Sequence, residues 1–239
     1  SMPTMYFSQL VQEFVDSTDG WTTLDSRGDD RLDERPVPGS PVALHRSTGS
    51  ISPDQSSRLR SLLISGGELR RCWDLGLQHA RVVQRIGENA ELLHLVYEPI
   101  NSRLRRRDYV VVRVRRTLSD GTLIVLTRSV PHPLLPPSSD VVRGDYFSAM
   151  VLLPPLPFET SVQFVYVSMV NLGGLVPDAI ANAADAASAA SVLPQLRRAF
   201  AENAVGAFRM RSMQMEQPRD RQRAYVPIAA TVLFPHTIQ

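Results

Sequence analysis

The chain has 239 residues, of which 43% are hydrophobic and 7% aromatic, and its 26 basic residues are all arginines. Because lysine is absent, chemistries that need an ε-amino group are excluded, among them a Schiff base to pyridoxal phosphate and a Walker-type phosphate-binding lysine. A net charge of only +2 does not favour a general nucleic-acid surface, and no apolar stretch reaches the roughly 20 residues of a membrane span.

The N-terminal quarter of the sequence predicts two helices and one short strand. Apolar residues recur at helical spacing over 4–16, and a glycine ends that pattern. Residues 25–40 are rich in charge and then in proline, glycine and serine, which indicates a connection, whereas 42–45 is typical of a short strand. Ser52-Pro53 supplies the cap and the first residue of a helix over 53–64.

The middle of the sequence changes to strand patterns that are rich in valine and leucine. Asp120-Gly121 is a strong hairpin signal, since these residues tolerate the positive φ values of a tight turn. Strands joined in this way are antiparallel. The six predicted strands are 81–86, 91–97, 108–116, 123–130, 141–153 and 161–172.

The alanine-rich segment near the C-terminus predicts one long helix over 178–209, interrupted at Pro194. The fold class is therefore α+β, with helices at the ends around an antiparallel sheet of at least six strands. Two arrangements are compatible with this order. The last helix packs flat on the sheet, or it closes over a curved sheet and leaves a cavity.

Few residues are arranged for catalysis or metal binding. The five histidines lack the spacing of metal ligands, and no Gly-x-Ser-x-Gly elbow is present, so we expect no enzyme, no metal and no cofactor. The arginine-rich run 103–107 is either a solvated strand end or a surface that attracts anionic lipid or phosphate. On the strand that follows, alternation alone places Arg113 on the solvent side.

The compartment is indicated by the cysteine content. Cys72 is the only cysteine, and it allows no internal disulfide. Together with an N-terminus that does not resemble a signal peptide, this is typical of a reducing compartment. We therefore expect a cytoplasmic protein.

Several motifs, taken together and in order, resemble the START (steroidogenic acute regulatory protein-related lipid-transfer) domain. Trp73-Asp74 matches that family's Trp-Asp pair, and 171–177 followed by Asn182 resembles the segment that enters its final helix. The central part of the match consists of Arg107-Asp108-Tyr109-Val110, Arg113, Asp120-Gly121, Ser129-Val130, His132-Pro133, Pro136-Pro137 and Val142-Arg143.

The resemblance implies a helix-grip fold, in which a curved antiparallel sheet wraps around the long C-terminal helix and encloses a lipid tunnel. It implies a START-like lipid-binding domain over 4–210 and a C-terminal extension over 211–239. It also implies that Arg113 faces the tunnel. Because the segment between His45 and Trp73 is shorter than in typical members, we expect one or two edge strands to be truncated.

The family resemblance also bears on the ligand. In members that bind sterols, an acidic residue on the strand that matches 91–97 pairs with the arginine that matches Arg113. The nearest positions here hold His94 and Leu95, so we expect this pair to be absent. A sterol is therefore disfavoured.

Members that transfer phosphatidylcholine are the closer match within the family. Their head-group arginine and aspartate match Arg70 and Asp74, two aromatic residues of their choline cage match Tyr109 and Phe147, and Tyr97 lies near the third. Aromatic faces attract a quaternary ammonium, and an arginine suits a phosphate. The alternative for the first two residues is a plain ion pair at a helix end. The predicted ligand-binding residues are Arg70, Asp74, His94, Tyr97, Tyr109, Arg113 and Phe147.

We therefore expect non-covalent binding and intermembrane transfer of a single lipid, with a phospholipid favoured over a sterol. The partners implied are this lipid and, transiently, a membrane surface, so that the protein is cytoplasmic and peripheral to membranes. No nucleic-acid partner is expected. The alternative is a lipid-sensing or partner-binding regulatory module in a larger protein with further domains.

Overall fold

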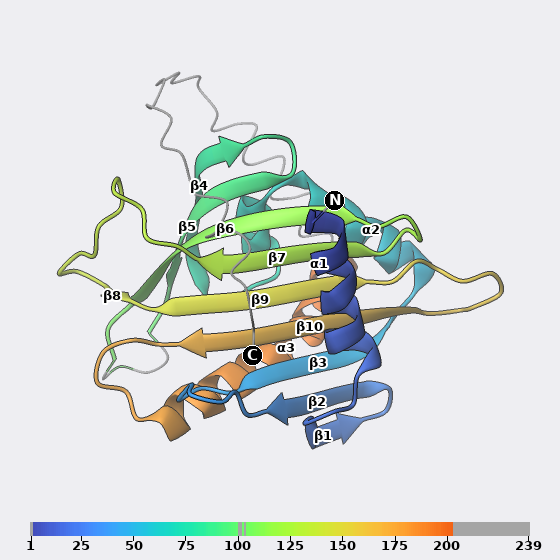
Figure 1. Cartoon of the computed structure of the whole chain (residues 1–239), viewed down its shortest axis with the longest axis horizontal. Coiled ribbons are helices and arrows are strands. Elements are labelled where there is room, and N and C mark those ends of the chain that lie inside the picture. Colours follow the sequence, from blue (N-terminus) through green and yellow to red (C-terminus); the bar gives the residue numbers. More distant parts are fainter. Residues whose placement is uncertain (1, 100–101, 103, 203–239) are drawn as a thin grey trace.

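The computed structural model describes residues 2–99, 102 and 104–202 (Figure 1). The expected extension 211–239 and Arg103 of the arginine-rich run lie outside the described residues. The helical elements are α1 (Met2–Val11), the π-helical segment η1 (Gln12–Asp16), α2 (Pro53–Ser65), the 3₁₀ segment η2 (Gly67–Cys72) and α3 (Asp178–Ala201). The strands are β1 (Thr22–Arg27), β2 (Asp30–Arg35), β3 (Leu44–Ile51), β4 (Leu77–Ile86), β5 (Ala90–Tyr97), β6 (Arg107–Thr117), β7 (Leu123–Ser129), β8 (Val142–Arg143), β9 (Asp145–Leu152) and β10 (Val162–Asn171).

Within the described residues these ten strands form one sheet, in the order β1-β2-β3-β10-β9-β7-β6-β5-β4. The short β8 pairs with β6 in parallel, and the other pairings are antiparallel. After β3 the chain passes through α2 and η2 to the opposite edge of the sheet at β4. It then returns strand by strand, so that β10 pairs with β3 in the interior of the sheet.

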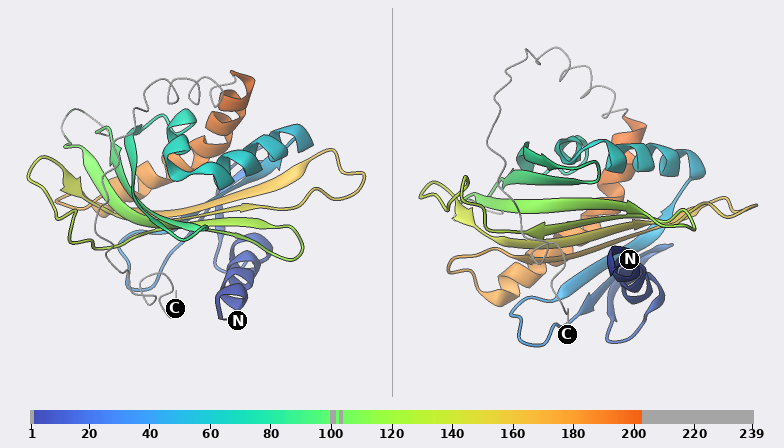
Figure 2. Two further views of the ribbon diagram at one scale, coloured as in Figure 1. Left: turned by 90° about the horizontal axis from the view of Figure 1, so that it is seen from above. Right: turned by 45° about the horizontal axis from the view of Figure 1, so that its top comes forward.

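The curved sheet lies between two helical layers. Figure 2 shows α2 and α3 on one face, which we call the inner face, and α1 on the other, which we call the outer face. The inner core includes Phe164 and Tyr166 against α2 and α3, and the outer core includes Phe7 and Phe14 of the N-terminal helical segments. The chain thus forms the helix-grip α+β fold, with the C-terminal helix against the concave side of the sheet.

Because both faces of the sheet are covered, both sets of alternating side chains are apolar and buried. Val110, Val111 and Val112 of β6 are all less than 4% exposed. The exposure predicted for Arg113 from simple alternation is therefore wrong, since this residue is only 6% exposed.

The two helices on the inner face of the sheet, α2 and α3, were both predicted from the sequence. Ser52 forms a capping box with Gln55 at the start of α2, with Pro53 in the first turn. The last helix continues through Pro194 as one element within the described residues, so the predicted interruption does not divide it. Alanines such as Ala189, which is fully buried, let α3 approach the sheet closely.

The early part of the sheet differs from the expectation. The predicted connection over 25–40 contains β2 and the second half of β1, and β3 extends to Ile51 along its whole pairing with β10. The charged sequence of β2 conceals a strand because its Asp33 is buried in an ion pair with Arg46, 2.8 Å away on β3. The truncation expected between His45 and Trp73 is therefore wrong. None of the described helices has the length and hydropathy that a membrane-spanning helix requires.

Candidate functional site

A cavity of about 420 Å³ lies between α3 and the inner face of the sheet. Its walls come from the end of η2, from β5, β6, β9 and β10, and from α3. The open question about the last helix is thereby answered, because this helix covers a hollow in a curved sheet. The charged residues on the cavity wall are Arg70, Asp74, Glu98, Arg107 and Asp185, and its tyrosines are Tyr97, Tyr109 and Tyr146.

Arg70 and Asp74 form one polar group on this wall. The Arg70 Nε donates to Asp74 Oδ2 at 2.7 Å, and the Tyr97 hydroxyl donates to the same oxygen at 2.7 Å. The short η2 segment holds Arg70 one turn before Asp74, so that the two side chains meet. Burial acts to lower the pKa of Arg70, but the oxygens of Tyr146, Tyr97 and Asp74 outweigh it and raise this pKa. The pair is both a local ion pair and part of the cavity wall.

Three tyrosines form a row beside this pair. The ring centroids of Tyr97 and Tyr109 are 5.7 Å apart, and those of Tyr109 and Tyr146 are 5.5 Å apart. The rings are steeply inclined to one another, at 81° and 59°, so they do not stack face to face. The Tyr146 hydroxyl accepts a hydrogen bond from Arg70 at 2.6 Å and contacts the Tyr166 hydroxyl at 3.0 Å. Burial raises the pKa of Tyr97 and of Tyr109, which keeps both phenols neutral at physiological pH.

Three of the predicted site residues, Phe147, His94 and Arg113, do not line this cavity. Phe147 packs on the outer face against Phe14, with ring centroids 6.1 Å apart. The residue on the cavity wall is its neighbour Tyr146, because adjacent strand residues point to opposite faces.

His94 also lies away from the cavity. Its Nε2 contacts Asp108 Oδ2 at 2.8 Å, and Arg143 donates to the same carboxylate. Leu92 on the same side of β5 belongs to an outer cluster with Val112. His94 therefore belongs to a polar cluster of the sheet.

Arg113 has an acidic partner, contrary to the expectation. Glu91 lies directly opposite it on β5, and Arg113 Nη1 donates to Glu91 Oε1 at 2.8 Å. The same carboxylate oxygen accepts from the Gly67 amide at 2.7 Å, and a second Arg113 nitrogen donates to the Leu63 carbonyl. Burial lowers the pKa of Arg113 to about 10, against the opposing effect of Glu91. This pair ties the sheet to the end of α2 and does not line the 420 Å³ cavity.

Three charged residues on the cavity wall, Glu98, Arg107 and Asp185, were not among the predicted site residues. Arg107 stands two residues before Tyr109 on β6, so the period of a strand places both on the inner face. Asp185 is an acidic residue within the alanine-rich α3 and is only 3% exposed. Strand parity could have identified the arginine, and the isolated acid in an apolar helix could have identified the aspartate.

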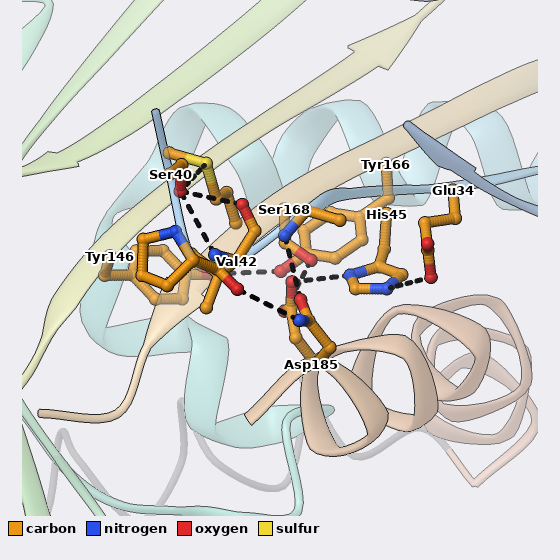
Figure 3. A network of polar contacts seen from close by, with 12 residues as sticks. Glu34, Ser40, Val42, His45, Tyr146, Tyr166, Ser168 and Asp185 are labelled. Carbon is orange, nitrogen blue, oxygen red and sulfur yellow. Dashed lines mark hydrogen bonds and ion pairs between the residues drawn. The ribbon is translucent and has the colours of Figure 1, made fainter. Parts of the chain in front are cut away.

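Asp185 connects α3 to the sheet (Figure 3). Its Oδ2 contacts His45 Nδ1 at 2.9 Å, and its Oδ1 accepts from the Ser168 hydroxyl at 2.8 Å. Glu34 approaches the other ring nitrogen of His45 at 3.4 Å. The helix is therefore fixed to β3 and β10 at the level of the cavity by buried polar contacts.

Comparisons with known proteins agree with this architecture. A model of the START domain family matches residues 6–205. The mitochondrial steroidogenic acute regulatory protein of Salvelinus fontinalis is 25% identical over 192 residues, which cover 78% of this chain and 65% of that protein. The mitochondrial StAR-related lipid transfer protein 7 of Homo sapiens is 30% identical over 145 residues, 58% of this chain and 38% of that protein. This chain thus spans less than two thirds of the length of either relative.

A solved structure gives the corresponding result for the fold. Human StAR-related lipid transfer protein 5 superposes with a TM-score of 0.72, and the match covers 87% of this chain and 97% of that one. The two sequences are 21% identical. At this identity the likeness concerns the fold alone.

Proposed function

The chain belongs to the START domain family, and we propose that it binds a single lipid without covalent chemistry and transfers it between membranes. The observation that carries this proposal is the cavity of about 420 Å³ between α3 and the sheet, lined by tyrosines, aliphatic side chains and a few charged groups. Cavities of this size are typical of small-molecule sites. The polar head group of an amphipathic lipid fits such a lining.

The lipid class we propose is a phospholipid with a quaternary ammonium head group. Tyr97, Tyr109 and Tyr146 present inclined rings at 5.5 and 5.7 Å spacing, and each ring that meets an ammonium contributes about 0.5–2 kcal/mol. Asp74 adds a carboxylate beside them. The presence of Glu91 removes the argument against a sterol that rested on a missing acid, so the preference for phospholipid now rests on the tyrosines and the cavity charges.

Entry of the acyl chains requires movement of α3. The side chains that α3 packs against the inner face, such as Leu193 and Leu196, are fully buried in the core next to the cavity. We propose that α3 shifts at a membrane surface, as lids do in other ligand-binding proteins, and that the protein works in the cytoplasm between such encounters.

A vesicle assay tests the transfer function. Donor vesicles carrying fluorescent phosphatidylcholine are mixed with unlabelled acceptor vesicles, and the rate of transfer is measured with wild type, Tyr109→Leu and the matched control Phe147→Leu. Both variants remove one aromatic ring from the sheet, but only Tyr109 lines the cavity. We expect transfer to fall with Tyr109→Leu and to persist with Phe147→Leu. Binding without transfer would instead favour the lipid-sensing module, and neither binding nor transfer would contradict the proposal.

A further inference from the structure

Arg107 is a buried arginine that has no carboxylate partner among the residues described by the structure. It is 4% exposed and lies on the wall of the cavity. Its Nε donates to the Leu172 carbonyl at 3.3 Å and its Nη1 to the Arg105 carbonyl, and Nη2 makes no hydrogen bond to any residue that the structure describes. Both acceptors are backbone carbonyls, so they orient the guanidinium without neutralising its charge.

The other buried arginines show how unusual this is. Among those in the described part of the chain, Arg46 pairs with Asp33 and Arg113 with Glu91, each at 2.8 Å. A buried charge without an opposite charge is strongly unfavourable unless another group compensates it. The cavity beside Arg107 is where such a group can enter.

Four acids lie near Arg107 or line the same cavity. Asp74 is bound to Arg70, and Glu98 is exposed and forms no ion pair with Arg107. Both oxygens of Asp185 accept hydrogen bonds from the sheet, and Asp108 points to the other face, where Arg143 and His94 contact it. Neither forms an ion pair with Arg107. The compensating anion is therefore expected to come from a ligand.

Arg70 is less suited to this role than the sequence suggested. Its Nε is bound to Asp74 and its Nη2 to the Tyr146 hydroxyl. A phosphate at Arg70 would have to compete with a carboxylate 2.7 Å away, whereas no carboxylate of the described residues forms an ion pair with Arg107. Arg107 also shares a strand face with Tyr109, the middle ring of the tyrosine row.

We propose that Arg107 is the phosphate-binding residue of the cavity, and that it holds the phosphate of the lipid head group while the tyrosine row takes the ammonium. This inference rests on the proposed function. Tyr97 lies opposite Arg107 on β5 and Tyr109 lies two residues along β6, so the phosphate and the ammonium of one head group can be bound side by side. Guanidinium groups suit phosphate because they donate two parallel hydrogen bonds.

The first test compares binding of phosphatidylcholine from vesicles by wild type, Arg107→Met and Arg106→Met. Arg106 is the adjacent, exposed arginine, so its variant makes the same change of charge outside the cavity. We expect Arg107→Met to bind phosphatidylcholine at least about tenfold more weakly, as for the loss of a charge-assisted contact, and Arg106→Met to bind like wild type. Equal binding by wild type and Arg107→Met overturns the inference and leaves the proposed function standing, whereas no binding by wild type removes the proposed function itself.

A second measurement separates contact from damage to the fold. Arg107→Lys keeps the positive charge but loses the planar fork, and the ³¹P chemical shift of bound phosphatidylcholine is recorded for this variant and for wild type. A changed ³¹P shift in Arg107→Lys supports direct contact with the phosphate. An unchanged shift overturns the inference, even where Arg107→Met has lost binding through misfolding.

Discussion

Replacing Glu91 by leucine tests the structural role of the ion pair between Glu91 and Arg113. Both residues are buried, with 3% and 6% exposure, and their charged atoms are 2.8 Å apart. Removing one member of a buried pair costs about 3–5 kcal/mol, because the other charge stays buried without compensation. The Gly67 amide also loses its acceptor. For a domain of 150–250 residues, where 1 kcal/mol shifts Tm by about 2–4 °C, we expect a decrease in Tm of roughly 6–20 °C.

The assay is urea denaturation and thermal melting, both followed by circular dichroism. Glu88→Gln, in the exposed turn next to Glu91, is the control, and its free energy of unfolding should lie within about 0.5 kcal/mol of the wild-type value. The double variant Glu91→Leu/Arg113→Met should recover much of the loss, since an apolar pair of similar volume is often as stable as a buried ion pair. A Glu91→Leu protein as stable as wild type would refute this reasoning. Loss of lipid binding in Arg113→Met at unchanged stability would restore Arg113 as a ligand-binding residue.

Three further predictions concern the cavity wall and its supports. In Gly144→Ala the new Cβ would lie 2.4 Å from Tyr109 Cε1 and 2.8 Å from the Asn171 carbonyl oxygen. We expect the ring and the start of β9 to shift and phosphatidylcholine binding to fall by about 2- to 30-fold, the equivalent of one cation–π contact, with the fold retained by circular dichroism. Asp185→Leu removes the acceptor of His45 and should lower the free energy of unfolding by about 1–3 kcal/mol, with faster amide hydrogen exchange in α3. Burial acts to raise the pKa of Asp108, but hydrogen bonds from the adjacent histidine and arginine outweigh it and hold this pKa below 3.8. A carboxyl group whose pKa is lower in the folded state than in the unfolded state stabilises the fold at pH values above its unfolded pKa. This stabilisation is lost as the pH falls through its folded pKa, so the difference in free energy of unfolding between wild type and Asp108→Asn, measured in urea, should shrink below pH 3.8. A gap that stays constant from pH 7 to pH 3, or full lipid binding by Gly144→Ala, would argue against these assignments.

The central strands were predictable from the sequence because both of their faces are buried. Continuous valine and leucine runs gave β5, β6, β7, β9 and β10 within a few residues of their observed bounds. The hairpin of β1 and β2 was not predictable in this way, because β2 carries charges that are satisfied by tertiary contacts. Arg197 of α3, for example, donates to Asp30 at the start of that strand.

The site was predicted only in part, because residues that are adjacent in a strand point to opposite faces of the sheet. A shift of one residue along a strand moves a side chain to the other face, so the choice of Phe147 over Tyr146 placed one of the predicted aromatic residues outside the cavity. The failure to predict the acidic partner of Arg113 has the same cause. The acid was sought at position 94 or 95, whereas the register of β5 and β6 sets Glu91 opposite Arg113. Register depends on the assembled sheet and is not fixed by local sequence.

Arg107 was overlooked because the composition of a segment does not show which of its residues are buried. In the sequence it belongs to an arginine-rich run that is typical of a solvated strand end, and its neighbours Arg105 and Arg106 are indeed exposed. Only the inner face of β6 distinguishes Arg107 from them.

The most direct test of the central claim is native mass spectrometry of the wild-type chain after incubation with vesicles that contain phosphatidylcholine, phosphatidylethanolamine and cholesterol. We predict that each chain binds one lipid and that this lipid is phosphatidylcholine. A chain that remains free of lipid under these conditions would contradict the binding function, and a chain that takes up only cholesterol would contradict the assignment of the tyrosine row and Arg107 to a phospholipid head group.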